Sequence, residues 1–190
     1  EDNLYLRYHS FVSEIVLSGS KVMGVVTTGK DGKKLIKAKV FIDATGDADI
    51  DEMSGIRTDI DERKNLMPLT IGFRAGGIDT QRFRKFADEN PDAFNKLITD
   101  LGISVKIGGW TETLHPNTIW FNISHIENIY PFNTEELTKA EIKGRWQIYK
   151  LVEAFRKSAD GCENIYIIDT ASQIGIRETR RIKGLYRLGA

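Results

Sequence analysis

The residues best suited to chemistry lie in two short segments, and the first follows an apolar run over residues 40–42. An acid and then a set of small and acidic residues come directly after it: Asp43, Ala44, Thr45, Gly46 and Asp47. Small side chains leave the backbone accessible, so a ligand can approach it closely. Ligands of open α/β sheets bind at the carboxyl ends of strands, where an acid can accept hydrogen bonds from sugar or ribityl hydroxyls. The alternative is a tight strand-to-helix turn capped by Asp47, which is the more common use of such a pattern.

The second segment is rich in arginine. Arg177, Arg180 and Arg181 lie close together in the sequence. If the segment is a strand, Arg177 and Arg181 share one face and Arg180 points to the other. Guanidinium groups bind phosphates and carboxylates through paired hydrogen bonds. The alternative is a solvated strand whose charge is balanced by Glu178, because surface charge clusters of this kind are common.

Other reactive residue types give no comparable pattern. His9, His115 and His125 are scattered along the chain, so no metal site is expected. Cys162 is the single cysteine and has no histidine near it in the sequence, so we expect an inert thiol rather than a nucleophile. The sequence contains no Gly-x-Ser-x-Gly motif, which argues against a serine hydrolase.

The composition excludes several classes of protein. The 190 residues are 41% hydrophobic and 28% charged, which is too apolar for an intrinsically disordered chain. No apolar run reaches the roughly 18 residues that a membrane-spanning helix needs, so no membrane partner is expected. The 27 basic and 27 acidic residues give a net charge of zero, which argues against a nucleic-acid partner.

The ends of the sequence favour an excised piece of a longer protein. The chain begins Glu1-Asp2-Asn3-Leu4 without an initiator methionine and shows a strand-like pattern from residue 4. It carries no signal peptide or lipidation motif. We expect a cytoplasmic protein, although a targeting segment could have been lost upstream.

A mixture of strands and helices must position these residues. Residues 4–45 predict a β-meander with a hairpin at Asp31-Gly32, and its last strand, 35–44, is continuously apolar over 40–42, as in a strand buried on both faces. Helices are predicted at 47–53, 81–89, 91–101 and 134–158, and further strands at 69–74, 118–123 and 164–169. The predicted fold class is therefore α+β, with a β-meander, mixed sheets and one long helix.

The long helix carries a partial apolar stripe, which we expect to face the core. Its members recur at spacings near three and four: Leu137, Ile142, Trp146, Tyr149, Val152 and Phe155. Trp110, Trp120 and Trp146 are likewise interpreted as core residues.

Taken together, the two segments resemble the hallmark of the FAD-dependent oxidoreductase family within the glutathione-reductase-like flavoproteins. Residues 40–49 read Val-Phe-Ile-Asp-Ala-Thr-Gly-Asp-Ala-Asp, and residues 174–186 read Ile-Gly-Ile-Arg-Glu-Thr-Arg-Arg-Ile-Lys-Gly-Leu-Tyr. The order of the parts is also similar, because a β-meander with residues 22–26 precedes the first segment and a long helix with residues 137–145 precedes the second.

The resemblance implies that the parent protein is an FAD-bound oxidoreductase with a small-molecule substrate and an FAD/NAD(P)-binding fold. The strand that corresponds to residues 40–45 lies beside the cofactor in that family. The cofactor-binding residues that it implies are Ala44, Thr45, Gly46, Asp47, Arg177 and Arg180. The flavin performs the redox chemistry, so no catalytic side chain is named.

The implied domains are an edge of the FAD-binding domain at 1–55, a substrate-domain-like region at 56–170 and a return strand toward the FAD domain at 171–190. The family's opening Gly-x-Gly-x-x-Gly motif and its closing flavin-binding segment do not occur in this sequence. We therefore interpret the chain as an interior piece that, on its own, is inactive and does not retain FAD.

The substrate, the electron acceptor and the oligomeric state are left open by the sequence. The alternative function is a non-catalytic ligand- or protein-binding module. In that case the aromatic strand with Trp120 and Phe121, together with the stripe of the long helix, would form the partner surface.

Overall fold

The structure is a computed structural model that describes residues 3–104 and 109–186 and divides into two compact units. Unit 1 comprises residues 1–61 and 179–190, and unit 2 comprises residues 62–178. The outermost residues of the expected domains 1–55 and 171–190 lie outside the described residues. Within the described part of the chain, no helix is both long and apolar enough to cross a membrane.

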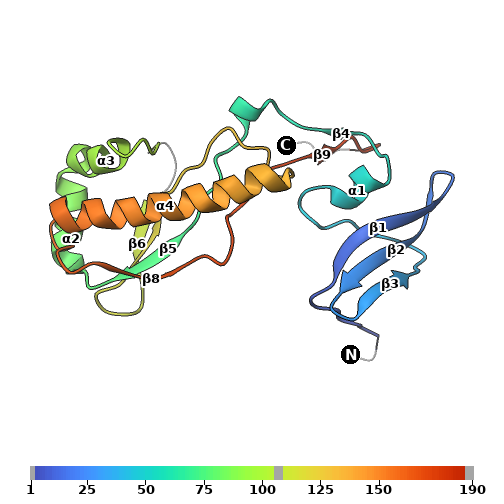
Figure 1. Ribbon diagram of the computed structural model, residues 1–190, viewed down its shortest axis with the longest axis horizontal. Helices are drawn as coiled ribbons and strands as arrows, with labels where there is room; N and C mark the ends of the chain where they lie inside the picture. The colour runs from blue at the N-terminus through green and yellow to red at the C-terminus, as the bar shows by residue number, and fades with distance from the viewer. Residues whose placement is uncertain (1–2, 105–108, 187–190) are drawn as a thin grey trace. The chain divides into compact units, whose positions relative to one another are not determined.

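A three-stranded antiparallel sheet forms most of unit 1 (Figure 1). Its strands follow one another in sequence and in space: β1 (Phe11–Ser18), β2 (Lys21–Gly29) and β3 (Gly32–Ile36). Gly29 pairs with Gly32 across the β2–β3 turn. Gly32 has a φ of +95°, a backbone conformation that glycine adopts without the strain of a side chain. The predicted β-meander and its Asp-Gly hairpin are therefore confirmed.

Two predicted β-segments at the edges of the meander are wrong. The chain is irregular over residues 4–9, and β3 ends at Ile36 rather than continuing to residue 44. Val40 and Ile42, predicted to be buried on both faces, are 74% and 85% exposed. A strand needs a neighbour to satisfy its backbone groups, and no described strand pairs with residues 37–44.

The remainder of unit 1 consists of short elements. The helix α1 (Asp49–Met53) lies within the predicted range 47–53 and ends at Ser54, as expected. Two-residue strands β4 (Thr58–Asp59) and β9 (Arg181–Ile182) pair antiparallel. The arginine-rich segment is therefore largely irregular, and the predicted strand with Arg177 and Arg181 on one face is wrong.

Unit 2 contains a four-stranded sheet in the order β6-β7-β5-β8. The strands are β5 (Phe73–Gly76), β6 (Gly109–Glu112), β7 (Ile119–Asn122) and β8 (Tyr166–Thr170), and a short 3₁₀ helix, η1 (Arg63–Asn65), precedes them. Every pairing in the described residues is antiparallel, so the mixed sheets that we predicted are not found there. The α+β class itself is confirmed.

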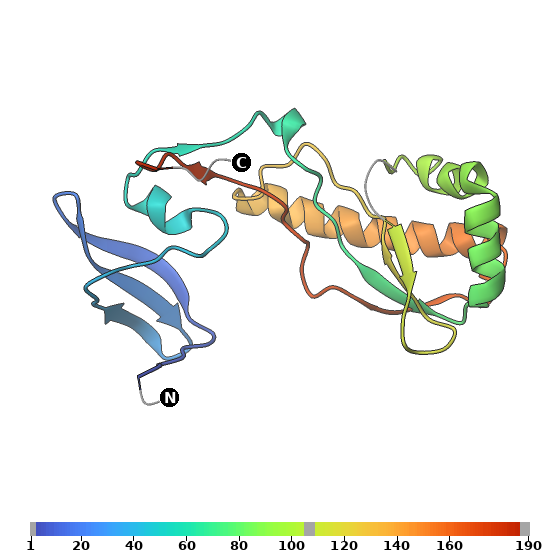
Figure 2. The same ribbon diagram turned by 180° about the vertical axis from the view of Figure 1, so that it is seen from behind.

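Three helices accompany this sheet: α4 runs along it in Figures 1 and 2, and the other two lie at one end of it. They are α2 (Thr80–Glu89), α3 (Pro91–Thr99) and α4 (Thr134–Ser158). The Asp79 side chain accepts a hydrogen bond from Arg82 N, and the Asn133 side chain accepts one from Glu136 N. These caps fix the starts of α2 and α4 within one residue of the predicted starts at residues 81 and 134. The ring of Phe121 lies 5.7 Å from that of Phe83 and 5.6 Å from that of Phe155.

The buried face of α4 differs from the predicted stripe. Ile142, Trp146 and Tyr149 are exposed, whereas Val152 and Phe155 are buried as predicted. The helix packs through small and apolar residues at the same spacing but rotated from the predicted stripe: Ala140, Gly144, Ile148, Leu151 and Phe155. Small residues let the helix approach the sheet closely, which a pattern of large side chains does not reveal.

Two of the three tryptophans predicted to lie in the core are also exposed. Trp110 is partly buried and packs edge-on against Phe83, at 5.1 Å between ring centroids. Trp120 is 40% exposed and Trp146 is 59% exposed, so these two are not core residues. Cys162 is fully buried, and burial raises the pKa of its thiol to about 12, which confirms the inert thiol.

Candidate functional site

A turn between the meander and α1 contains four of the six predicted site residues. The carboxylate of Asp43 accepts hydrogen bonds from the backbone N–H groups of Thr45 at 2.8 Å and Ile50 at 3.1 Å. Asp51 N donates to the same carboxylate at 3.4 Å. These bonds tie the first turn of α1 to the preceding chain. Asp43 therefore serves as the acceptor at this helix start, and the alternative cap by Asp47 is wrong.

Two carboxylates in this turn have pKa values shifted in opposite directions. Partial burial of Asp43 would raise its pKa, but the hydrogen bonds from Thr45 and Asp51 outweigh burial and lower it. Burial raises the pKa of Asp51, and the neighbouring charge of Asp43 raises it further. Asp43 is the carboxylate that this turn holds ionised.

The small residues of the turn leave its backbone open. Gly46 has a φ of +84°, and a Cβ built on it would meet no heavy atom within 4 Å. Ala44 and Thr45 are exposed beside it. The N–H groups of Gly46 and Asp47 donate to no residue in the described part of the chain. The turn can therefore receive a flat group against Gly46 and offer it backbone donors.

The far end of the chain fixes the second half of this turn. The Thr179 hydroxyl donates to the Asp47 carboxylate at 2.7 Å, and Arg180 Nε donates to the Asp47 carbonyl oxygen at 3.1 Å. Arg180 also forms an ion pair with Asp49 and is 15% exposed. The structure thus brings the predicted residues Asp47 and Arg180 into contact, all within unit 1.

The predicted cofactor-binding residues do not include three residues of this arrangement, Asp43, Asp49 and Thr179. Asp43 carries a recognisable signal, because it is the acid directly ahead of the small residues. Asp49 and Thr179 carry none, because the contact of Thr179 with Asp47 joins positions 132 residues apart. Such pairings depend on the fold rather than on local spacing.

Arg177 is the remaining residue of the six predicted to bind the cofactor, and it belongs to unit 2. It lines a pocket of about 300 Å³ together with Thr70, Trp120 and Asn122. The structure therefore does not group Arg177 with the turn residues in one compact unit. Its pocket is a separate candidate site.

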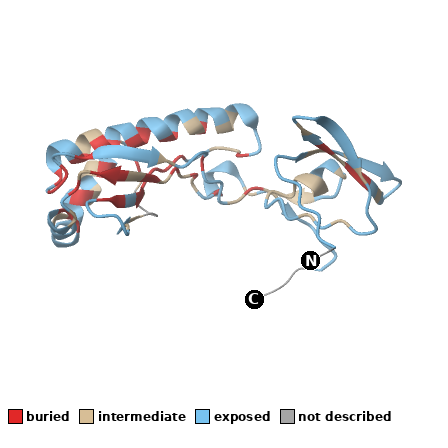
Figure 3. Cartoon of the chain, turned by 90° about the horizontal axis from the view of Figure 1, so that it is seen from below, coloured by how far each residue is buried: buried red, intermediate tan, exposed pale blue. Residues whose placement is uncertain are grey.

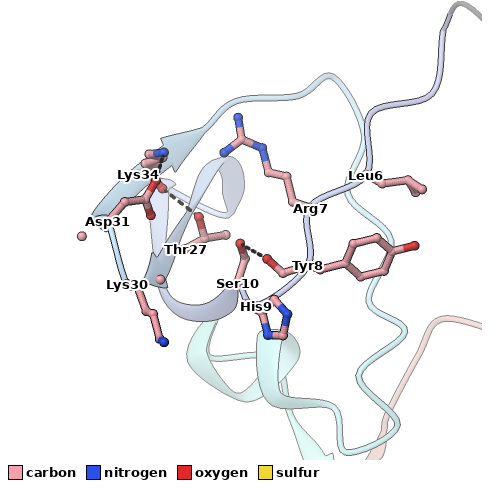
Figure 4. A pocket seen from close by; sticks show the side chains of 11 residues that line it. Leu6, Arg7, Tyr8, His9, Ser10, Thr27, Lys30, Asp31 and Lys34 are labelled. Carbon is pink, nitrogen blue, oxygen red and sulfur yellow. Dashed lines mark hydrogen bonds and ion pairs between the residues drawn. The ribbon is translucent and has the colours of Figure 1, made fainter.

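A second cavity, of about 520 Å³, lies between the N-terminal segment and the β2–β3 hairpin (Figure 4). The Arg7 side chain extends toward the hairpin, whereas the ring of Tyr8 points away from it. Several polar groups there already have partners, since Lys34 pairs with Asp31 and Thr27 Oγ1 donates to the carbonyl oxygen of Lys34 at 3.4 Å. None of the six predicted residues lines this cavity.

Searches of curated proteins and of solved structures relate the chain to few known proteins. A search with the sequence found no match among curated proteins. Two solved structures are similar, those of the flavin-dependent brominase Bmp2 and of a triple mutant of it. Each is 12% identical with a TM-score of 0.45, and the match covers 94% of this chain. The chain spans 40–41% of the length of those proteins.

A family model gives the assignment. The model described as FAD dependent oxidoreductase matches residues 1–190, which is the whole chain. The small-residue turn and the arginine-rich segment both lie within this match. The protein therefore belongs to the FAD dependent oxidoreductase family.

Proposed function

We propose that the protein acts as part of an FAD-dependent oxidoreductase and that the Ala44–Asp47 turn lies beside the cofactor. The observation that carries the proposal is the family match over the whole chain, which includes this turn. The activity of the whole protein and its small-molecule substrate are part of the proposal.

The residues of the turn fit a flavin. A Cβ at Gly46 would occupy the open space that a flat ring or ribityl chain would fill. The N–H groups of Gly46 and Asp47 would donate hydrogen bonds to it, and Thr45 offers an exposed hydroxyl. When bound, FAD supplies the hydride and electron chemistry.

Arg180 and Thr179 act as positioning residues in this proposal. Both hold Asp47, and Arg180 also pairs with Asp49 at the start of α1. Because Arg180 already has these partners, its role is to fix the shape of the turn. A charge-assisted hydrogen bond is stronger than a neutral one, so this contact is suited to keeping the turn in one conformation.

We also propose a division of roles along the chain. Residues 1–55 would form an edge of the FAD-binding domain, residues 56–170 the substrate side, and residues 171–190 the return toward the FAD domain. The separation of the chain into compact units at 1–61 with 179–190 and at 62–178 is consistent with such a division. A cofactor contact by Arg177 stays a prediction.

The test measures flavin binding by the full-length protein. Bound flavin is detected by visible absorbance, once after purification and again after addition of FAD. Asp47→Ala is expected to lower flavin occupancy, because it removes the acceptor of Thr179 and loosens the turn. Asp31→Ala is the matched control, since Asp31 lies in the same unit, pairs with the exposed Lys34 and is not part of the turn. A colourless protein that takes up no FAD would contradict the proposal, and equal occupancy in Asp47→Ala would remove Asp47 from the site.

One observation favours the alternative of a binding module. Ile142, Trp146 and Tyr149 form an exposed row on α4, with the two aromatic rings in edge contact at 5.7 Å. Phe121 does not contribute to such a surface, because it is fully buried. Calorimetry against candidate partners in the absence of FAD distinguishes the two functions, since only the module binds a partner independently of flavin.

A further inference from the structure

The pocket that contains Arg177 is built by extended segments far apart in the sequence. Thr70 and Gly175 form an antiparallel bridge, with Thr70 N donating to the Gly175 carbonyl at 3.2 Å and Gly175 N donating back at 2.7 Å. This register sets Pro68 opposite Arg177. Met67 N donates to the Glu178 carboxylate at 2.8 Å, which holds the next pair in place. The backbone beneath Arg177 is therefore fixed on both sides.

The face of the sheet determines which side chains reach this pocket. Leu69, Ile71 and Phe73 are buried on the side that α4 covers. By alternation, Thr70 and Gly72 lie on the opposite face, and Trp120 and Asn122 share that face on β7. Thr70, Trp120 and Asn122 all line the pocket.

A flat apolar wall is provided by Trp120. A Cβ on Gly72 would lie 3.0 Å from Trp120 Nε1 and 3.2 Å from its Cζ2, so the indole lies directly over this glycine. Opposite Asn122, Gly109 has no side chain, and a Cβ there would meet nothing within 4 Å. Gly72 therefore lets the indole of Trp120 lie against the sheet, and Gly109 leaves space in front of Asn122.

Three polar side chains converge on this space without partners. Within the described residues, the Arg177 guanidinium, the Asn122 amide and the Thr70 hydroxyl make no hydrogen bond or ion pair. Asn122 and Thr70 are partly buried, so these groups are already partly withdrawn from water. Unpaired donors beside an apolar wall are the usual lining of a small-molecule site.

The charge of the pocket selects its ligand. Arg177 is the one charged residue among the described residues that line it, and no carboxylate does so. The nearest acid in sequence, Glu178, is engaged by Met67 N. An anion would therefore meet a cation and two neutral hydrogen-bonding groups, with no carboxylate among the described residues of the lining.

We propose that this pocket binds the carboxylate of a small, flat, apolar molecule, with Arg177 pairing the carboxylate and Trp120 contacting the flat body. The identification of that molecule as the substrate rests on the proposed oxidoreductase function, whereas its binding does not. The shared chemistry, an anion on a flat body, also describes the diphosphate of FAD. A pocket of about 300 Å³ suits a one- or two-ring molecule better than a dinucleotide.

The test measures binding of 4-fluorobenzoate by ¹⁹F NMR to the 190-residue chain without added flavin. Arg177→Gln is expected to weaken binding at least about tenfold, since a hydrogen-bonded charge is lost. Arg177→Lys should bind more tightly than Arg177→Gln, because lysine keeps the positive charge. It should bind less tightly than the unchanged chain, because lysine lacks the two parallel N–H donors of the guanidinium. The matched control Arg84→Gln removes an arginine of the same unit that already pairs with Glu112 at 2.5 Å, and it should bind as the unchanged chain does.

Neutral and phosphate probes complete the test without relying on a variant. 4-Fluorobenzamide, which has the same shape but no charge, should bind at least about tenfold more weakly than 4-fluorobenzoate. Equal binding of the two, or equal binding to Arg177→Gln, overturns the proposal. Inorganic diphosphate or FAD that binds at Arg177 while 4-fluorobenzoate does not would assign the pocket to the cofactor and also overturn it. A colourless full-length protein whose chain binds 4-fluorobenzoate through Arg177 would refute the flavin function alone.

Discussion

At the scale of single residues, Asp43 is the clearest case of a side chain that stabilises the fold through its hydrogen bonds. Its carboxylate accepts from three backbone N–H groups around the start of α1. Asp43→Ala is expected to lower the free energy of unfolding of the region by roughly 0.5–2 kcal/mol, as for other helix caps. Thermal melts at neutral pH measure this loss.

The pH dependence of the same variant has a defined sign. The folded pKa of Asp43 is lowered, so its stabilisation is present above the ordinary value of 3.8 and is lost as the pH falls through the lowered pKa. The difference between the unchanged chain and Asp43→Ala should therefore be constant above about pH 4 and shrink in more acidic solution. Asp51→Asn is the control, since the pKa of Asp51 is raised and neutralising it should not destabilise the fold. Equal melting temperatures at neutral pH would contradict the role of Asp43.

His125 is the second residue with a testable anomaly. It is 4% exposed, and neither ring nitrogen has a hydrogen-bond partner within the described residues. Its backbone, in contrast, is bonded on both sides by the Gln147 amide, at 3.0 and 2.8 Å. His125→Leu should leave stability unchanged or raise it, by up to roughly 1–3 kcal/mol, because two unsatisfied polar atoms are removed.

Gln147→Leu makes the matching comparison. It leaves a buried N–H and a buried carbonyl without their partner, so we expect a loss of roughly 1–3 kcal/mol for each group in urea unfolding. A His125→Leu variant that unfolds as easily as Gln147→Leu would show that the imidazole has a partner such as a bound water.

At the scale of elements, the close approach of α4 to the sheet depends on Gly144. A Cβ at this position would lie 2.6 Å from Ile71 Cδ1 and 3.2 Å from Ile126 Cδ1, both in the core. Gly144→Ala gains about 1 kcal/mol in helix propensity but overpacks the core, which costs typically 1–3 kcal/mol. We therefore expect a net loss of stability in chemical denaturation.

The double variant Gly144→Ala with Ile71→Val identifies the cause. Ile71→Val removes the Cδ1 atom that the new methyl group would meet. The double variant should be more stable than the sum of the two single effects, which is the signature of a relieved contact. Additive losses would mean that the methyl group is accommodated elsewhere.

A comparison of predicted and observed elements shows which parts of the fold the sequence predicts. Sequence signals were sufficient where the structure depends on neighbouring residues, as at the start of α4 at residue 134 and at the Asp31-Gly32 hairpin. The buried face of α4 was missed because Ala140 and Gly144 carry little hydrophobic signal, although they make the closest packing. The apolar run at 40–42 was misread because hydrophobicity alone does not say which strand pairs with it.

At the scale of the whole molecule, the buried residues are distributed unevenly between the units. The core cluster lies entirely in unit 2, and Figure 3 shows buried residues concentrated around α4 and its sheet. Val25 is the one buried apolar side chain in the described part of unit 1. Burial of apolar surface is the main stabilising contribution, so unit 1 should open at lower free energy than unit 2.

Hydrogen exchange of the 190-residue chain measures this difference. Amides of β1–β3 are expected to exchange faster than those of β5, β7 and α4, despite similar hydrogen bonding within each sheet. Equal protection across both units would mean that unit 1 has stabilising contacts that burial does not reveal. The six predicted site residues illustrate the same limit of sequence reasoning. The family resemblance named Asp47, Arg180 and Arg177 together as cofactor contacts, but it gave no sign that Arg177 belongs to a different compact unit from the other two.

The bridge between Thr70 and Gly175 also bears on how the molecule reaches its final form. Met67 and Glu178, next to that bridge, are 111 positions apart, so this side of the pocket joins the two ends of a long loop. Closing such a loop carries a large entropic cost, and contacts of this kind tend to form late in folding. The recovery of ligand binding at Arg177 would then mark the final folding step. During refolding, the helical signal of the chain should return before ligand binding does.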